Sequence, residues 1–143
     1  MGKSNTFIND FLKLIFNGTA IANLADNAAS SPLTDLYVAL HTADPGAAGN
    51  QSTNEISYTS YARVAVSRNS GGWTVTGQTV SPTLDIDFPI STGGTGGTAT
   101  HASIGTASSG TGKILWSGAL SPTIAISTGT PPVLVQGSTI TES

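Results

Sequence analysis

The chain lacks cysteine and has few charged residues. With no cysteine among 143 residues, neither a disulfide framework nor a thiolate metal site can form, so packing and interfaces must supply the stability. Charged residues make up 9% of the chain, against about a quarter in most soluble proteins. A surface poor in Lys and Glu has little repulsion to overcome and little side-chain entropy to lose in an interface. This composition suits a subunit of an assembly, although it also suits a secreted or other low-charge β-protein.

The shortage of cations and of long apolar segments excludes two classes of partner. The net charge is −3 and the five cations are scattered, so no basic stripe is available to neutralise phosphates and nucleic-acid binding is not expected. The apolar segment from Phe7 to Phe16 is interrupted by polar residues and is too short to span a bilayer. We therefore expect no membrane partner. The five cations are Lys3, Lys13, Arg63, Arg68 and Lys113.

The N-terminal segment has the periodicity of an amphipathic helix. Apolar residues recur at spacings of three and four from Phe7 to Ile15, Thr6 is a possible N-cap, and Asn17-Gly18 is a stop signal. We predict that residues 1–31 form this helix and an arm.

The rest of the chain reads as strands and turns. Its short apolar segments and Gly-rich turns predict a mainly β fold, in which residues 32–143 form one β-sandwich domain of the jelly-roll kind. Leu84, Ile86 and Phe88 should face the core, and Ser70-Gly71-Gly72 should join two strands in a hairpin. The predicted strands are Leu36–Thr42, Glu55–Tyr58, Ala62–Arg68, Trp73–Thr76, Thr83–Phe88, Thr98–Ile104, Lys113–Ser117, Thr123–Ser127 and Val133–Thr139.

No residue pattern in the sequence has the spacing of a known catalytic or cofactor-binding motif. The stretch from Gly105 to Ile114 resembles a phosphate-binding loop, but Ala107 and Ile114 occupy the positions that need a glycine and a hydroxyl. The two histidines have no ligand-like spacing to the acidic residues. Asp85 and Asp87 alternate as the solvated face of a strand. We therefore expect no enzyme activity, no cofactor and no metal.

Interface candidates come from three places. The polar loop of residues 43–53 is either an interface arm or a plain surface loop. Two tyrosines beside Glu55 could form a sugar-binding face, but tyrosines at strand ends more often bond the backbone and pack on the core. Arg63 should pair with Glu55 or with a neighbouring subunit. The candidates, including the apolar helix residues, are Phe7, Phe11, Ile15, Asp44, Pro45, Asn50, Glu55, Tyr58, Tyr61 and Arg63.

Four motifs carry a resemblance to a known family. They are Leu-His-Thr-x-x-Pro-Gly from Leu40, Asn-Glu-x-x-Tyr-x-x-Tyr-Ala-Arg from Asn54, a Trp after the Gly71-Gly72 turn, and His-x-x-Ile-Gly-x-x-x-x-Gly-x-Gly from His101. In this order they resemble small structural proteins of tailed-bacteriophage virions, commonly labelled tail-fibre proteins and similar to capsid decoration proteins. Ser60 stands where the family often has Gly. The resemblance covers roughly residues 6–141.

The resemblance implies a non-enzymatic virion protein, located on the surface of the phage particle and made in the cytoplasm of the host bacterium. A fibre shaft usually needs repeats or heptads, which this chain lacks. We therefore expect capsid decoration first, in which the protein cements the phage head by binding the major capsid protein. The alternative is a tail-fibre protein that binds tail proteins, and a carbohydrate-binding module is a lesser one. In either virion role the chain should form a homo-oligomer.

Overall fold

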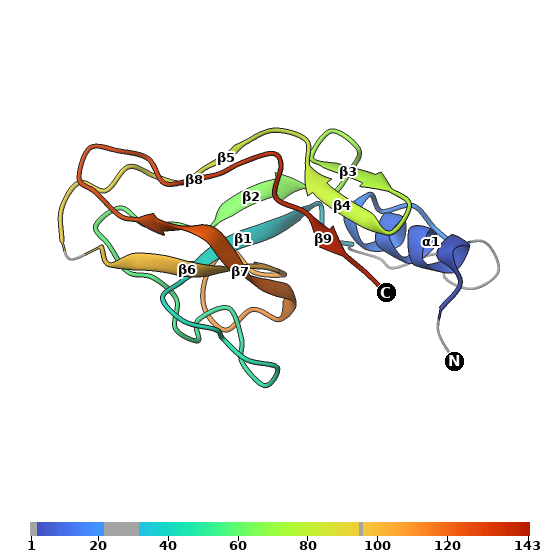
Figure 1. Cartoon of the computed structure of the whole chain (residues 1–143), viewed down its shortest axis with the longest axis horizontal. Helices are drawn as coiled ribbons and strands as arrows, with labels where there is room; N and C mark the ends of the chain where they lie inside the picture. The colour runs from blue at the N-terminus through green and yellow to red at the C-terminus, as the bar shows by residue number, and fades with distance from the viewer. Residues whose placement is uncertain (1–2, 22–31, 95) are drawn as a thin grey trace. The chain divides into compact units, whose positions relative to one another are not determined.

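The structure, a computed structural model, describes residues 3–21, 32–94 and 96–143. It is mainly β with one N-terminal helix, as predicted (Figure 1). The strands form a four-stranded sheet of order β2-β1-β6-β7, a three-stranded sheet of order β3-β4-β9 and a two-stranded pair, β5-β8. The jelly-roll arrangement stays a prediction. The elements are α1 (Asn5–Phe16), β1 (Asp35–His41), β2 (Val64–Ser67), β3 (Trp73–Thr76), β4 (Thr79–Pro82), β5 (Ile86–Asp87), β6 (Thr98–Gly105), β7 (Ile114–Ala125), β8 (Val133–Leu134) and β9 (Ile140–Thr141).

The chain divides into two compact units, each built from separate stretches. The first unit contains residues 1–35, 66–85 and 135–143, and the second contains residues 36–65 and 86–134. The greater part of the predicted N-terminal arm, residues 22–31, lies outside the described residues. The predicted division at residue 31 stays a prediction.

The helix of the first unit begins at Asn5 because Ser4 is its N-cap. The Ser4 hydroxyl accepts a hydrogen bond from the backbone N–H of Phe7 at 3.3 Å, which satisfies one of the donors that a helix start leaves unpaired. Thr6 was therefore the wrong cap. The predicted stop is confirmed, because Asn17 is the C-cap of the helix and Gly18 takes a φ of +64°.

An apolar core joins α1 to the three-stranded sheet of the first unit. Ile8, Leu12 and Phe16 are buried at the i, i+4 and i+8 positions of the helix. The rings of Phe16 and Trp73 meet edge to face, with centroids 5.0 Å apart, which is a favourable geometry for two aromatic quadrupoles. Val80 of β4 is 1% exposed in the same unit.

The hairpin lies elsewhere than predicted. β3 pairs with β4, and Thr76 stands opposite Thr79, so the connection is the two-residue turn of Gly77 and Gln78. Gly77 has a φ of +59°, which such turns require and which glycine adopts without strain. The predicted hairpin of β2 with β3 is wrong, because β2 and β3 belong to different sheets, and β1 is the neighbour of β2 among the described strands.

The second unit is built on the antiparallel pairing of β1, β6 and β7. Val38 stands opposite Ile104, and Ile104 stands opposite Trp116. In β1 the residues from Val38 to His41 are all buried, so both faces of this strand are covered, as expected for the interior of a layered domain.

Several strand predictions need correction. Glu55–Tyr58 is not a strand, since Glu55 makes only a single bridge with His41. The predicted strands Lys113–Ser117 and Thr123–Ser127 both overlap one longer strand, β7. β4 and β9 lie in stretches that were not predicted as strands or only bordered on them.

Leu84 does not face the core as the alternation predicted. Ile86 and Phe88 are buried, but Leu84 is 73% exposed. The strand β5 begins only at Ile86, so the alternation of side chains does not extend back to Leu84. The prediction failed because a polar-apolar pattern does not show where strand pairing begins.

Candidate interaction site

The guanidinium group of Arg63 ties together two loops of the second unit. We call residues 42–55 and 106–113 the loop pair. The Arg63 guanidinium donates to both carboxylate oxygens of Glu55, at 2.7 Å from Nε and 2.8 Å from Nη2. It also donates to the carbonyls of Ala107 at 2.9 Å and Gly110 at 2.7 Å. The side chain of Arg63 is 2% exposed, so a buried cation joins the two loops.

The Glu55–Arg63 pair is a charge-assisted and bidentate contact. The hydrogen bond to Glu55 raises the pKa of the Arg63 guanidinium above its ordinary value. Bidentate contacts of this kind fix both side chains in one orientation. Of the two partners that the sequence left open for Arg63, the structure has the internal one, Glu55.

Tyr61 connects the Glu55–Arg63 ion pair to strand β1. Its hydroxyl donates to Oε1 of Glu55 at 3.0 Å and accepts the backbone N–H of Leu40 at 3.1 Å. Burial raises the pKa of the Tyr61 phenol. Its ring is stacked on that of Phe88, with an interplanar angle of 9°. The tyrosine is therefore a structural tie between β1 and the loop pair.

Tyr58 is buried and points its hydroxyl inward. The side chain is 6% exposed, and the hydroxyl donates to the carbonyl of Pro89 at 2.8 Å. Burial raises the pKa of this phenol as well. Its ring meets that of Tyr61 edge to face, with the centroids 5.3 Å apart. The buried ring therefore does not offer a surface on which a sugar could stack.

Gln51 fills the space between the two loops. It is fully buried, its Nε2 donates to the carbonyl of Tyr37 at 3.0 Å, and its Oε1 accepts the N–H of Ala107 at 3.1 Å. Two glycines make room for it. A Cβ on Gly105 would lie 2.1 Å from the Gln51 side chain, and one on Gly112 would lie 2.2 Å from it.

The sequence did not single out Gln51, because a glutamine in a polar loop has no distinctive pattern. The only available signal was the pair of glycines. The stretch that contains them resembles a phosphate-binding loop in sequence, whereas Gly105 and Gly112 serve the close approach of Gln51.

His41 holds the start of the first loop in place through two side-chain hydrogen bonds. Its side chain is fully buried, with Nδ1 2.8 Å from the carbonyl of Thr53 and Nε2 2.7 Å from Oγ of Ser103. A carbonyl only accepts, so Nδ1 carries the proton and Nε2 accepts from the Ser103 hydroxyl in the neutral ring. Burial lowers the pKa of His41, which favours this neutral form.

The outer part of the loop pair is exposed and small. The Asp44 carboxylate accepts the N–H of Gly46 at 2.8 Å in an Asx turn. Asn50 similarly accepts the N–H of Ser52 at 2.9 Å. Pro45 is buried, but Ala47 and Ala48 are exposed. The loops extend beyond the ends of the strands in Figure 1, and their outer surface offers backbone groups and short side chains.

The ten candidate residues therefore fall in two places. Seven belong to the second unit, where Asp44 and Asn50 shape the first loop, while Glu55, Tyr61 and Arg63 tie it down. The other three are on α1 in the first unit, next to its buried face. Phe7 is 40% exposed, whereas Phe11 and Ile15 are half-buried.

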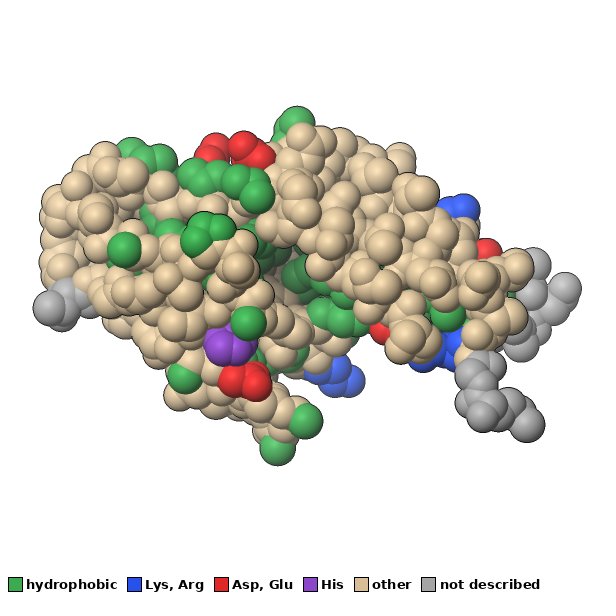
Figure 2. All heavy atoms as spheres, viewed as in Figure 1, with side chains coloured by type: hydrophobic (Ala, Val, Ile, Leu, Met, Phe, Trp, Pro, Cys, Tyr) green, Lys and Arg blue, Asp and Glu red, His purple; other side chains and the backbone are tan. Residues whose placement is uncertain are grey.

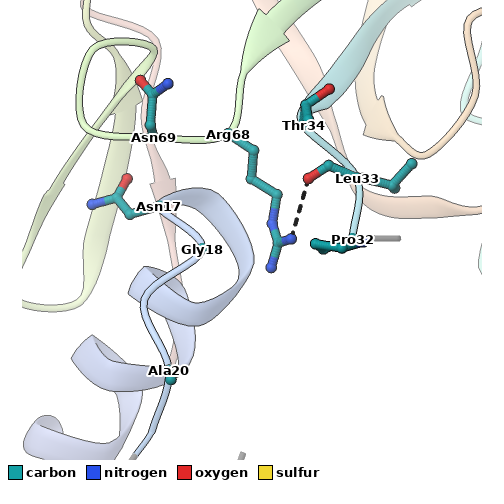
Figure 3. A pocket seen from close by; sticks show the side chains of 8 residues that line it. All are labelled: Asn17, Gly18, Ala20, Pro32, Leu33, Thr34, Arg68 and Asn69. Carbon is teal, nitrogen blue, oxygen red and sulfur yellow. Dashed lines mark hydrogen bonds between the residues drawn. The ribbon is translucent and has the colours of Figure 1, made fainter. Parts of the chain in front are cut away.

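A pocket of about 420 Å³ lies beside the C-terminal end of α1 in the first unit (Figure 3). The Arg68 guanidinium at its edge donates to the carbonyls of Leu14 and Ile15, both at 2.6 Å, and of Leu33 at 3.3 Å. A cation bound to the last carbonyls of a helix offsets its dipole. Arg68 therefore closes the helix, and we assign no ligand to this pocket. Its lining residues are Asn17, Gly18, Ala20, Pro32, Leu33, Thr34, Arg68 and Asn69.

The buried polar side chains of the loop pair bond to one another and to backbone groups. Within residues 3–21, 32–94 and 96–143, no group of three or more His, Asp or Glu side chains could hold a metal ion. In this same part of the chain, no helix is both long and apolar enough to cross a membrane. These buried polar ties lie beneath a surface of short, exposed side chains.

A comparison with known protein families identifies the family of this chain. A family model described as "Podophage GP4 fiber I protein gp80" matches residues 2–141. The chain belongs to this family, and it is a structural protein of the phage virion. No curated protein matches the chain. The resemblance carried by the four sequence motifs is confirmed.

Three of the four motifs meet at the loop pair in this chain. His41 of the first motif and Arg63 of the second bond to the loops, and Glu55 of the second belongs to one of them. Gly105 and Gly112 of the fourth motif leave room for Gln51.

Proposed function

We propose that the chain is a structural component of a tail fibre of a short-tailed phage and that it acts through non-covalent contacts without catalysis. The observation that carries the proposal is the match of almost the whole chain to a family named for a fibre protein. This name favours the tail-fibre alternative over capsid decoration, which was the first expectation from the sequence.

The lack of repeats fits a compact element of a fibre better than its shaft. A shaft gains length from repeated units, whereas this chain has two compact units and no such period. We therefore propose that it forms a joint or an attachment piece, with tail proteins as its partners.

The loop pair supplies a preorganised contact surface for this role. Its polar groups are held by Arg63, Gln51 and His41 before any partner arrives. Ordering loops on binding costs free energy, so loops that are already ordered bind more tightly for the same contacts. The outer residues can then meet a partner while the ties stay buried.

The face shown in Figure 2 fits a protein that works inside an assembly. Uncharged polar side chains and backbone atoms cover most of it, and Lys, Arg, Asp and Glu side chains are few. Charged residues are depleted from the centres of protein interfaces. The glycan-binding alternative has less support, because the rings of Tyr58 and Tyr61 pack against each other inside the second unit.

Microscopy of phage particles tests the proposed location. Gold-labelled antibody against this chain should mark the tail, and particles that lack the chain should lose adsorption to the host while their heads keep their resistance to rupture. Labels spread over the head, with heads that rupture at lower temperature when the chain is missing, would overturn the tail proposal in favour of capsid decoration.

Substitution on the outer surface tests the loop pair separately. Ser109→Arg adds a long charged side chain at an exposed position of the second loop, and we expect fewer copies of the chain per purified particle. Ser127→Arg is the matched control at an exposed position outside the loop pair. Equal incorporation of the two variants would remove the loop pair from the contact surface without changing the proposed location.

A further inference from the structure

The second loop of the loop pair holds two of its carbonyl groups inward. The Arg63 guanidinium donates to the carbonyls of Ala107 at 2.9 Å and Gly110 at 2.7 Å. In a planar trans peptide the C=O and the N–H of the following residue point in opposite directions. The N–H groups of Ser108 and Thr111 therefore point away from Arg63, toward the outer surface of the loop.

The N–H groups at the tip of the second loop are exposed and have no acceptor. Residues 108–111 are exposed in succession, and within the described ranges none of their backbone N–H groups donates a hydrogen bond. The φ of Gly110 is +72°, whereas that of Ser109 is negative. Successive N–H groups in a turn of this kind form a concave nest that binds anions. Because Arg63 fixes the carbonyls on the inner side, the donors of this turn lie on its outer side.

Lys113 adds a cation to the same loop. Its side chain is exposed and forms no ion pair among the residues that the structure describes. The two carboxylates of the loop pair are already bound, because Glu55 pairs with Arg63 and Asp44 accepts a backbone N–H. Residues 106–113 contain no Asp or Glu. The second loop therefore combines hydrogen-bond donors with a positive charge and has no anion of its own.

We propose that the second loop binds a carboxylate of a partner protein in the virion, which accepts from the N–H groups of Gly110 and Thr111 and lies beside the Lys113 ammonium. The inference rests on the proposed role of the loop pair as a contact surface, and it names the chemistry of the partner. Hydrogen bonds to an ionised acceptor are stronger than neutral ones. One cation balances the single charge of a carboxylate, whereas a phosphate monoester carries about −1.5 to −2.

Two side chains of equal length at Ser109 test the preference for an anion. Ser109→Glu and Ser109→Gln obstruct the exposed tip of the loop to the same extent, but only the glutamate repels a carboxylate. We expect purified particles to contain several-fold fewer copies of Ser109→Glu than of Ser109→Gln. An equal reduction for the two variants overturns the carboxylate and keeps the loop pair as a contact surface. Native incorporation of both variants contradicts the contact surface itself, and the carboxylate with it.

Substitution of Lys113 tests the cation separately. Lys113→Met should lower the number of copies per particle, and Lys113→Arg should restore most of it, because arginine keeps the positive charge. Both isolated variants should keep the native melting temperature, since the side chain is exposed. A Lys113→Met variant that is incorporated like the native chain contradicts the proposal.

Acetate and inorganic phosphate distinguish the two kinds of anion on the isolated chain. In amide NMR spectra at constant ionic strength, acetate should shift the resonances of Gly110 and Thr111 saturably, and less in Lys113→Met. The exposed N–H groups of Ala47 and Ala48, on the first loop, are the matched control and should not shift. Shifts with phosphate alone, equal shifts in both loops, or no shift with either anion would overturn the carboxylate site.

Discussion

The two units are stabilised by different kinds of contact. In the first unit, α1 packs on the β3-β4 hairpin through rings and aliphatic side chains, with Phe16 against Trp73 at its centre. In the second unit, the loop pair is held by hydrogen bonds between residues far apart in sequence, such as Arg63 and Gly110. Apolar packing tolerates small shifts, whereas a buried polar tie needs every partner in place. The stability of the first unit should therefore depend most on the volume of its buried side chains. The stability of the second unit should depend most on the hydrogen-bond partners of its buried polar groups.

The largest effect on this comparison should come from Phe16→Ala. Loss of the ring leaves a cavity beside Trp73, and such truncations cost about 3–5 kcal/mol of unfolding free energy. Urea denaturation followed by tryptophan fluorescence measures the loss. Phe7→Ala is the matched control, since Phe7 is 40% exposed and should cost far less. Equal losses for the two variants would contradict the assignment of Phe16 to the core.

Arg63→Met should destabilise the second unit by about 3 kcal/mol, because it leaves the Glu55 carboxylate without its cation and the carbonyls of Ala107 and Gly110 without donors. Hydrogen exchange should show loss of protection in the loop pair while the amides of α1 keep theirs. Lys113→Met removes an exposed cation at the end of the second loop and should have little effect. Uniform loss of protection over both units would show that they unfold together.

Gly105→Ala should cost about 1–3 kcal/mol, the usual range for overpacking, because the new Cβ would lie 2.1 Å from the Gln51 side chain. In the double variant with Gln51→Ala the costs should not add, since the second change removes the clash of the first. Gly118→Ala, on the neighbouring strand with open space above it, should be close to neutral. Additive costs would place the strain elsewhere.

The smallest expected effect is the pH dependence of stability, which arises from His41 in the second unit. Burial lowers the pKa of His41 in the folded chain, so the unfolded chain binds a proton more readily. Stability is then fully present above the ordinary histidine pKa of about 6.5 and is lost as the pH falls below it toward the lowered value.

The urea midpoint should therefore decline between neutral pH and about pH 5, and the decline should be shallower in His41→Gln. Glu55, Arg63 and His101 also act on the His41 ring, so the comparison uses the variant rather than the absolute slope. An unchanged slope in His41→Gln would contradict this source of the pH dependence.

Local patterns predicted the local structure well. The spacing of apolar residues located α1, and the short apolar segment Trp73–Thr76 has the bounds of β3. The N-cap was predicted two residues too late, at Thr6 instead of Ser4. Both residue types are good N-caps, so only the geometry of the chain decides between them. The mainly β class followed in the same way from strand lengths and turns.

Non-local features could not be predicted in the same way. The turn at Gly71 and Gly72 looked like a hairpin, yet the strands on its two sides enter different sheets, which no local pattern shows. The Glu55–Arg63 pair was foreseen as one of two options, because opposite charges eight residues apart suggest it. The Gln51 site was not foreseen, because its partners come from β1 and from the second loop.

The position of the Arg63 guanidinium also has a practical consequence. It binds the carbonyls of Ala107 and Gly110, so one group holds both ends of the exposed Ser108-Ser109 segment. A peptide inserted between these two serines would begin and end at anchored backbone, and long surface insertions add little to the entropy of loop closure. The second loop is therefore a natural place to attach a peptide label to the isolated chain, where the contact surface is not in use.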